Sequence, residues 1–241
     1  MNKNKKLKPF NIYWCLYVLV MIILIIVIAI LGNKLDLKGK YALLLGLDIF
    51  LYVSLRVYKF SLKLCPGFEY NYFNELVCYL CSQSCLLCLL GTIFKNVSMM
   101  AYCTTVGMAS AFMAVLMPEE YFENSKPLSI AALGFFGWHC LLIVACISFI
   151  TLHIYTPELK DFIYGPLWTL CLAFISHLVN IFLRKTKIHP EANYTYTYFP
   201  ENIILKKLYE KIPIPFVYLL PLIPAYALVS FVMIVIYRLF I

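Results

Sequence analysis

Residues 13–32 read YWCLYVLVMIILIIVIAILG, a run of 20 residues without a charged side chain. An α-helix rises 1.5 Å per residue, so about 20 apolar residues cross the roughly 30 Å hydrocarbon core of a bilayer. The run is longer than the roughly 7–15 apolar residues of a cleaved signal peptide, and no small-residue cleavage site follows it. The stretch therefore predicts a membrane-spanning helix that is retained in the protein.

The same apolar character extends over the whole chain of 241 residues, which is 63% hydrophobic and 13% charged, with a mean hydropathy of +0.85. A soluble domain carries about 25% charged residues, which cover its surface in water. The composition therefore predicts an all-α, polytopic membrane helix bundle, with a single transmembrane domain over residues 1–241. Seven transmembrane helices are expected, near residues 13–32, 41–60, 73–94, 99–117, 128–155, 162–183 and 215–237.

The 20 Lys and Arg residues outnumber the 12 Asp and Glu residues and are unevenly distributed between the predicted loops. With the N-terminus inside, the cytoplasmic segments hold 14 of these basic residues and the outer segments hold six. Lys and Arg are retained on the cytoplasmic side, so this count predicts a cytoplasmic N-terminus and an outer C-terminus. Because most of this charge lies beside lipid headgroups, the net charge of +8 does not indicate a nucleic-acid partner. The Lys-, Asn-, Ile- and Tyr-rich composition is typical of a low-GC bacterium, which predicts a multi-pass protein of the bacterial cell membrane.

Two polar side chains, Asp48 and His139, fall inside predicted spans at similar depths. A charge near the bilayer centre costs at least about 2.5–3.5 kcal/mol on insertion scales, so such residues indicate function or specific packing. An Asp beside an imidazole would set the tautomer of the ring and stabilise its protonated form. His177, near the cytoplasmic end of the sixth span, and His153, near the outer end of the fifth, compete with His139 for such a role.

The predicted third span carries four cysteines, Cys78, Cys81, Cys85 and Cys88, whose spacings of three and four place them on one helical face. Along one straight helix they extend over about 15 Å and cannot converge on one tetrahedral ion, so no zinc or iron–sulfur site is expected. The ten cysteines of the chain lie almost entirely in apolar runs, which argues against a disulfide framework. Two interpretations remain: close packing of small residues, or a nucleophile activated by a nearby base or cation.

A series of motifs runs from the third span to the last. In order it contains Cys81, Gly107 with Ser110, AVLMP at 114–118, His139, Asn180, NYTY at 193–196 with Pro200, and PIPFVY at 213–218. In order and spacing, between about residues 73 and 235, this series resembles the YwaF-like integral membrane proteins, the family that includes vertebrate transmembrane protein 164.

The resemblance implies acyl transfer between membrane phospholipids and lysophospholipids, because the vertebrate branch is described as a cysteine-dependent acyltransferase of ether lysophosphatidylethanolamine. It implies that Cys81 is the nucleophile and His139 its base, with a lysolipid or water as the acyl acceptor. The residues expected to contact the substrate are Asp48, Asn180, Asn193 and Tyr194. The basic segment 184–211 is expected to attract the phosphate. No metal or other cofactor is expected.

Other classes of membrane protein fit some of the same residues. A proton-coupled transporter of small solutes would use Asp48 and His139 around a site at the bilayer midplane. A b-type haem protein would use His139 and His177 as axial ligands. A non-catalytic membrane scaffold is the remaining alternative.

Overall fold

The computed structural model describes residues 7–65, 67–118, 120–201 and 203–240, and every regular element within these ranges is a helix. This confirms the predicted all-α class. The principal helices are α1 (Ile12–Gly32), α2 (Leu37–Ser61), α3 (Leu80–Phe94), α5 (Met108–Leu116), α8 (Trp138–Thr151), α9 (Tyr164–Lys185), α10 (Ile203–Lys211) and α11 (Ile223–Phe240). Shorter α-helices are α4 (Val97–Tyr102), α6 (Glu120–Glu123) and α7 (Ile130–Ala132). The 3₁₀ turns are η2 (Leu62–Leu64), η3 (Tyr72–Glu75), η6 (Leu159–Ile163), η7 (Tyr194–Tyr196) and η8 (Val217–Leu222), and the π-helical turns are η4 (Cys103–Gly107) and η5 (Leu133–Gly137).

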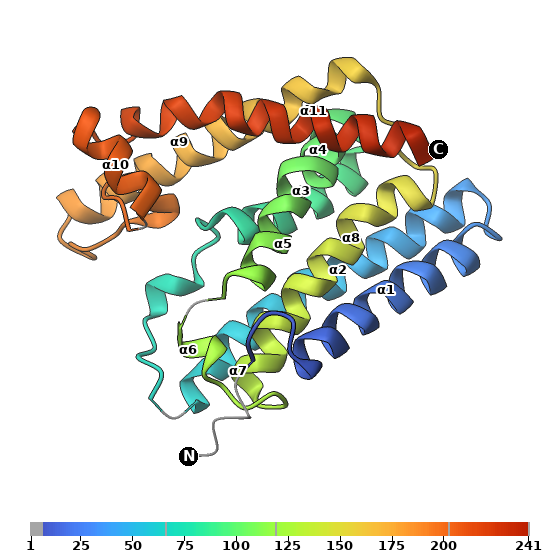
Figure 1. Ribbon diagram of the computed structural model, residues 1–241, viewed down its shortest axis with the longest axis horizontal. Helices are drawn as coiled ribbons and strands as arrows, with labels where there is room; N and C mark the ends of the chain where they lie inside the picture. The colour runs from blue at the N-terminus through green and yellow to red at the C-terminus, as the bar shows by residue number, and fades with distance from the viewer. Residues whose placement is uncertain (1–6, 66, 119, 202, 241) are drawn as a thin grey trace.

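Helices α9 and α11 run along the long axis of the molecule, and α1, α2, α5 and α8 run obliquely to it (Figure 1). Helix α8 packs against α1, α2 and α5, whereas α11 packs against α9. Figure 1 shows α9 and α11 together along one side, α1, α2 and α8 along the other, and α3 and α5 between them. Because α8 is surrounded, most of its side chains are buried, His139 among them.

Six helical segments in the described part of the chain are long and apolar enough to cross a membrane. They are Ile12–Gly32, Leu37–Leu64, Val97–Leu116, Ile130–Thr151, Leu159–Lys185 and Val217–Leu239. Each lies within a few residues of a predicted span, and together they support an integral membrane protein. The cytoplasmic location of the N-terminus, which rests on the distribution of Lys and Arg, stays a prediction.

The predicted count of seven is not confirmed, because the span expected at 73–94 is only partly helical. Helix α3 begins at Leu80 and has 15 residues; at 1.5 Å per residue it is about 22 Å long, shorter than the roughly 30 Å hydrocarbon core. The residues before Leu80 make contacts with distant parts of the chain. The hydroxyl groups of Ser176 and Thr195 both donate to the backbone carbonyl of Cys78, at 2.9 and 2.6 Å, and so occupy an acceptor that a longer helix would use.

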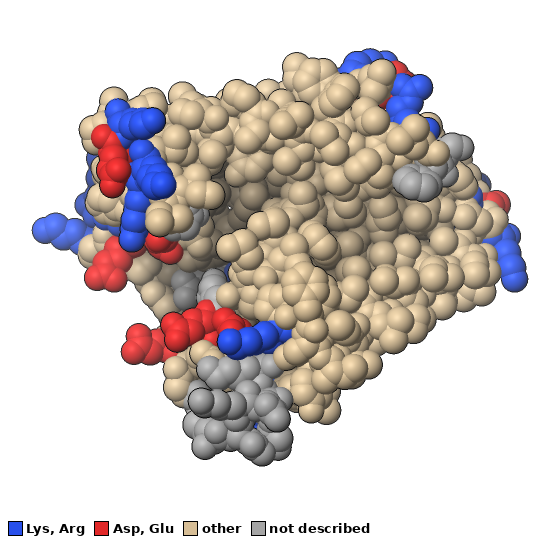
Figure 2. All heavy atoms as spheres, in the orientation of Figure 1, with Lys and Arg blue, Asp and Glu red and all other residues tan. Residues whose placement is uncertain are grey.

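The charged residues separate from the apolar ones on the molecular surface. Figure 2 shows Lys, Arg, Asp and Glu gathered toward the two ends of the visible face, with a broad band of uncharged residues between them. Many large apolar side chains of α1 and α11 are exposed, including Ile23 at 49% and Leu228 at 63%. A band of exposed apolar side chains between two charged ends suits a protein whose middle is surrounded by lipid tails.

Small residues allow close approach of helices in the interior. The thiols of Cys88 on α3 and Cys146 on α8 lie 3.6 Å apart, and all ten cysteines are free. A Cβ atom added to Gly165 on α9 would lie 1.8 Å from the hydroxyl oxygen of Ser230 on α11, so only glycine fits there. Packing of this kind is a principal source of helix association in a bilayer, where lipid tails are as apolar as the side chains.

Candidate functional site

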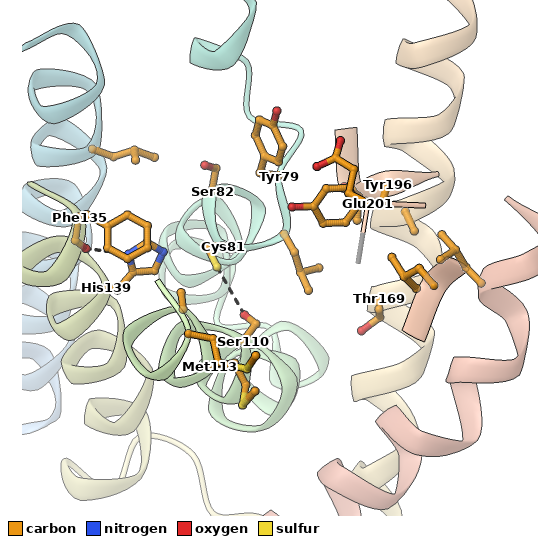
Figure 3. A pocket seen from close by; sticks show the side chains of 18 of the residues that line it. Tyr79, Cys81, Ser82, Ser110, Met113, Phe135, His139, Thr169, Tyr196 and Glu201 are labelled. Atoms are coloured by element: carbon orange, nitrogen blue, oxygen red, sulfur yellow. Dashed lines mark hydrogen bonds between the residues drawn. The ribbon is translucent and has the colours of Figure 1, made fainter. Parts of the chain in front are cut away.

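A cavity of about 890 Å³ opens between the two sides of the bundle. Its walls are mainly apolar and aromatic, and they come from the end of α2, the start of α3, α5, α8, α9, α10 and α11. Figure 3 shows Cys81, Ser110 and His139 among the side chains around it, with Thr169, Tyr196 and Glu201 on the side opposite His139. A mostly apolar cavity with a few polar side chains is typical of a small-molecule or lipid site.

Cys81 lies in the first turn of α3, the end at which the unpaired N–H groups of a helix carry partial positive charge. The thiol donates to the hydroxyl oxygen of Ser110 at 3.8 Å, and that hydroxyl donates in turn to the backbone carbonyl of Gly107 at 2.8 Å. Ser110 therefore fixes the direction of the thiol within the cavity.

His139 is 7% exposed, and its ring orientation is fixed by one backbone contact. Its Nδ1 lies 2.7 Å from the carbonyl oxygen of Phe135. A carbonyl oxygen only accepts hydrogen bonds, so Nδ1 carries the hydrogen and Nε2 of the neutral ring has a free lone pair. In Figure 3 the ring lies between Phe135 and the part of the cavity where Cys81 lies. His139 therefore presents a proton acceptor on the nitrogen that is not tied to the backbone.

The contact between Cys88 and Cys146 shows how α3 and α8 face each other. Cys88 follows Cys81 by seven residues, and Cys146 follows His139 by seven residues. Seven residues are close to two full helical turns, so each pair shares one face of its helix and is separated by about 10 Å along the axis. Since Cys88 and Cys146 touch, Cys81 and His139 occupy the facing sides of α3 and α8 one layer nearer the helix starts. The two side chains share the cavity without a hydrogen bond between them among the bonds of the described residues.

Each of the two helices that carry Ser110 and His139 is preceded by a π-helical turn. Turn η4 ends at Gly107 directly before α5, and turn η5 ends at Gly137 directly before α8. A π turn breaks the regular pairing of backbone groups and is frequently found at functional sites. Side chains make use of the carbonyls at both turns, because Ser110 donates to Gly107 and His139 donates to Phe135.

Three of the residues predicted to contact the substrate hold together a loop next to the cavity, namely Asn180 on α9 and Asn193 and Tyr194 in the loop itself. Asn180 is fully buried; its amide donates to the Tyr194 carbonyl and the Thr197 hydroxyl, and its carbonyl accepts from the Tyr194 N–H. Tyr194 donates its hydroxyl to the carbonyl of Phe73 at 2.8 Å, and burial, followed by the neighbouring Cys78, raises its pKa to about 12. None of these side chains is among the described residues that line the cavity.

Thr195 and Tyr196, which the same loop holds in place, do line the cavity. Asn193 stabilises the loop further, because its carbonyl oxygen accepts from the N–H groups of Tyr198 and Phe199 at 3.1 and 3.0 Å. Direct contact of Asn180, Asn193 or Tyr194 with a substrate stays a prediction, and the geometry gives them a positioning role.

Asp48 lies elsewhere in the bundle. It is fully buried, its Oδ2 accepts from the hydroxyl of Thr92 at 2.5 Å, and its Oδ1 has no partner among the described residues. The sequence predicted that Asp48 would set the tautomer of His139, but in the structure the Phe135 carbonyl does so. The sequence indicated the depth of Asp48 and His139 along their helices and not the helical face on which each lies, so it could not show that they bond to different partners.

His177 is also separate from His139. Its Nδ1 lies 3.2 Å from the Thr197 hydroxyl and its ring stacks on Phe216, so it belongs to the packing of α9. The structure therefore does not place the two histidines of the haem alternative in one cavity. Within the described ranges, no group of three or more His, Cys, Asp or Glu side chains is arranged to hold a metal ion.

The cavity is also lined by four residues to which the sequence patterns gave no role at the site, namely Lys59, Ser82, Tyr196 and Glu201. Lys59 stands at the end of a span and Glu201 in a basic loop, where charged residues are ordinary. For these two residues only the folded chain shows that they line the same cavity as Cys81.

These features define a polytopic membrane helix bundle in which a cysteine and a histidine share one apolar cavity. The chain belongs to the TMEM164 family, whose family model matches residues 7–240. This confirms the resemblance and extends it from the motifs of the later spans to the first two helices. Comparison with curated proteins and with solved structures gave no significant match.

Proposed function

We propose that this protein is a lipid-modifying enzyme of the bacterial cell membrane that transfers acyl chains between phospholipids and lysophospholipids, with Cys81 as the nucleophile and His139 as the general base. The observation that carries the proposal is the placement of a thiol and an imidazole with a free Nε2 lone pair in one apolar cavity. A nucleophile and a base in the same site are the minimal parts of a covalent acyl-transfer mechanism.

The reaction proceeds in two halves. In the first, Nε2 of His139 takes the thiol proton and the sulfur attacks the carbonyl carbon of a phospholipid ester. The ester C–O bond breaks, the imidazolium returns its proton to the leaving lysophospholipid, and the acyl chain stays on Cys81 as a thioester. In the second, a lysophospholipid hydroxyl gives its proton to His139 and attacks the thioester, which restores the thiol. Water in place of the lysophospholipid would release a fatty acid.

The cavity suits this chemistry for two physical reasons. Its volume of about 890 Å³ falls in the range of ligand pockets, and its apolar walls accept an acyl chain without leaving polar groups unpaired. The thiol of Cys81 donates to the Ser110 hydroxyl at 3.8 Å, and the mechanism requires it to exchange this acceptor for Nε2 of His139 when substrate is bound. Hydrogen bonds of catalytic groups often tighten only when substrate is bound.

The proton-coupled transporter has weaker support. Its two titratable groups, Asp48 and His139, bond to different partners, namely Thr92 and the Phe135 carbonyl. A shared proton would need them in one site, and only His139 lines the cavity among the described residues.

The test uses purified protein in vesicles that contain a diacyl phospholipid and an isotope-labelled lysophospholipid, with the lipid products measured by mass spectrometry. The wild type is expected to produce labelled diacyl phospholipid or free fatty acid. Cys81→Ala is expected to reduce product to background, and His139→Ala to reduce the rate by about 10²–10⁴-fold, the usual contribution of a general base.

The matched control is Cys85→Ala, which removes a thiol one turn further along α3 that does not line the cavity. Its turnover is expected to stay close to that of the wild type. Full activity of Cys81→Ala in correctly folded protein would end the proposal. Denaturation of the wild type after brief incubation with donor lipid, followed by mass analysis, is expected to show an acyl group on Cys81 that hydroxylamine removes.

A further inference from the structure

Helix α3 meets the cavity with its first residues and not with one of its faces. Four consecutive residues line the cavity, namely Tyr79, Leu80, Cys81 and Ser82, and no later described residue of α3 does so. Successive residues of an α-helix are rotated by about 100° around its axis, so a cavity along one face would be lined by residues three or four apart. The four consecutive lining residues therefore place the N-terminal end of α3 at the cavity wall.

Three backbone N–H groups at this end of α3 are unpaired in the described part of the chain. They belong to Leu80, Cys81 and Ser82. The N-cap residue Tyr79 makes no side-chain cap hydrogen bond, and its carbonyl accepts from the next N–H group, that of Gln83, at 2.9 Å. The first N–H groups of a helix carry partial positive charge, so an uncapped helix end at a cavity is suited to a negatively charged group.

A buried hydroxyl group without a partner lies at the same place. Ser82 is 4% exposed and lines the cavity, and its hydroxyl has no hydrogen bond among those of the described residues. Figure 3 shows Ser82 next to Cys81 at the start of α3. The neighbouring Ser84 differs, because its hydroxyl donates to the Leu80 carbonyl at 2.9 Å. Buried polar groups are normally paired, so the unpaired hydroxyl of Ser82 indicates that a ligand supplies its partner.

We propose that the start of α3 is the oxyanion hole of the reaction, in which the N–H groups of Cys81 and Ser82 and the hydroxyl of Ser82 bind the negatively charged oxygen of the tetrahedral intermediate. The inference rests on the proposed function for the reaction itself and adds Ser82 as a catalytic residue. The N–H group of the residue after the nucleophile has this role in α/β-hydrolases, and here that residue is Ser82.

The hydrogen bonds act on charge that moves during the reaction. When the sulfur of Cys81 attacks the ester carbonyl, the C–S bond forms and the electron pair of the C=O π bond moves to the oxygen. The donors at the start of α3 stabilise this oxygen until the pair returns and the ester C–O bond breaks. His139 then protonates the leaving lysophospholipid. Donors that are already oriented before attack need no rearrangement when the charge develops.

Ser82→Ala tests the hydroxyl in the vesicle assay. It is expected to lower kcat by about 10²-fold or more, the usual loss for one oxyanion-hole donor, and to leave KM within about twofold of the wild type. Ser82→Thr keeps a hydroxyl and is expected to retain at least about a tenth of the wild-type kcat. The matched control is Ser54→Ala, which removes a hydroxyl that donates to the Leu51 carbonyl on α2, outside the described cavity lining. An unchanged kcat in Ser82→Ala would overturn the assignment.

A long-chain alkyl trifluoromethyl ketone tests the same site without turnover. The sulfur of Cys81 adds reversibly to the ketone carbonyl, and the adduct carries the charged oxygen that the hole would bind. The corresponding trifluoromethyl alcohol has the same chain but no carbonyl, so its affinity reports the shape of the cavity and correct folding. The ketone is expected to bind the wild type at least about 100-fold tighter than the alcohol, as a transition-state analogue does.

Ser82→Ala is expected to reduce this ratio of affinities at least about tenfold and to leave the affinity of the alcohol unchanged. Replacing residue 82 with the α-hydroxy acid analogue of serine turns its amide into an ester, which removes the N–H group alone. This change is also expected to reduce the ratio at least about tenfold. A ratio unchanged by the ester would overturn the role of the N–H group.

The two ligands distinguish failure of this inference from failure of the proposed function. Equal affinity of the wild type for ketone and alcohol would show that Cys81 is not a nucleophile and would overturn both. A ketone preference that Cys81→Ala removes and Ser82→Ala leaves unchanged would support the nucleophile and overturn the role of Ser82. A preference lost in both variants, together with a wild type that turns over no lipid, would support the oxyanion hole and reject the acyltransferase.

Discussion

Replacing Asn180 with alanine is expected to destabilise the protein by about 2–6 kcal/mol, because three hydrogen bonds of a fully buried side chain are lost. The partners are affected unequally. The Thr197 hydroxyl keeps its contact with His177 at 3.2 Å, and the Tyr194 carbonyl keeps the Thr197 N–H at 3.3 Å. The Tyr194 N–H has Asn180 as its partner in the described structure and is left unpaired. A buried unpaired donor costs about 1–3 kcal/mol, and each of the other two lost bonds about 0.5–1.5 kcal/mol.

Thermal unfolding of the detergent-solubilised protein, followed by intrinsic fluorescence, measures this change. A shift of about 2–4 °C per kcal/mol for a chain of this size gives a fall in Tm of at least about 4 °C. Asn124→Ala is the control, because the amide of Asn124 makes one exposed bond, to the Glu120 carbonyl at 2.8 Å. A surface change of that kind is expected to stay within about 0.5 kcal/mol of the wild type.

Lipid turnover then separates a positioning role from direct contact with substrate. If Asn180 positions the loop, Asn180→Ala loses stability and activity together, because Thr195 and Tyr196 lose their support at the cavity wall. If Asn180 binds substrate directly, KM rises while Tm stays the same. An unchanged Tm in Asn180→Ala would refute the reasoning, whatever happens to turnover.

Three further changes test other parts of the structure. Asp48→Asn keeps an oxygen acceptor and is expected to leave lipid turnover within about twofold of the wild type in the vesicle assay; pH-driven solute uptake that this variant abolishes would instead favour a transporter. Gly165→Ala is expected to lower the free energy of unfolding by about 1–3 kcal/mol through overpacking. Gly46→Ala adds a Cβ with no atom within 4 Å, and it should raise the free energy of unfolding by up to about 1 kcal/mol in the same thermal assay. Mild oxidation with diamide is expected to join Cys88 and Cys146, whose sulfurs lie 3.6 Å apart, and peptide mapping without that crosslink would contradict the facing of α3 and α8.

Much of the fold could be predicted because a bilayer permits few backbone conformations. Backbone groups surrounded by lipid tails must be paired within a helix, so long apolar runs become helices whatever their neighbours are. The run 162–183 accordingly forms part of Leu159–Lys185, and the run 13–32 forms α1. Because a polar side chain in lipid is costly, the position of His139 inside a predicted span indicated a functional or packing role. The structure places His139 in the cavity.

The start of α3 could not be predicted, because a tertiary contact decides it. Residues 76–79 are apolar enough to extend the helix at its start, but Ser176 on α9 and Thr195 in the loop after α9 donate to the carbonyl of Cys78. Those donors lie about 100 residues away in the sequence, at separations of 98 and 117. Because the helix begins at Leu80, Cys81 lies in its first turn, at the cavity, rather than further inside a longer helix.

The two π-helical turns explain why helical periodicity, read from the start of a span, could not place the polar residues of the site. One extra residue in a turn shifts the following side chains by about 100° around the axis relative to those before it. Turns η4 and η5 stand directly before the helices that carry Ser110 and His139, so the apolar pattern that precedes each turn gives the wrong face for the residue that follows it. His139 and Cys146, seven residues apart, still share one helical face, because both follow η5 and belong to one uninterrupted α-helix. The placement of His139 at the cavity therefore depends on the break in the helix. A substitution that restored regular α-helical pairing at η5 is expected to turn His139 away from the cavity.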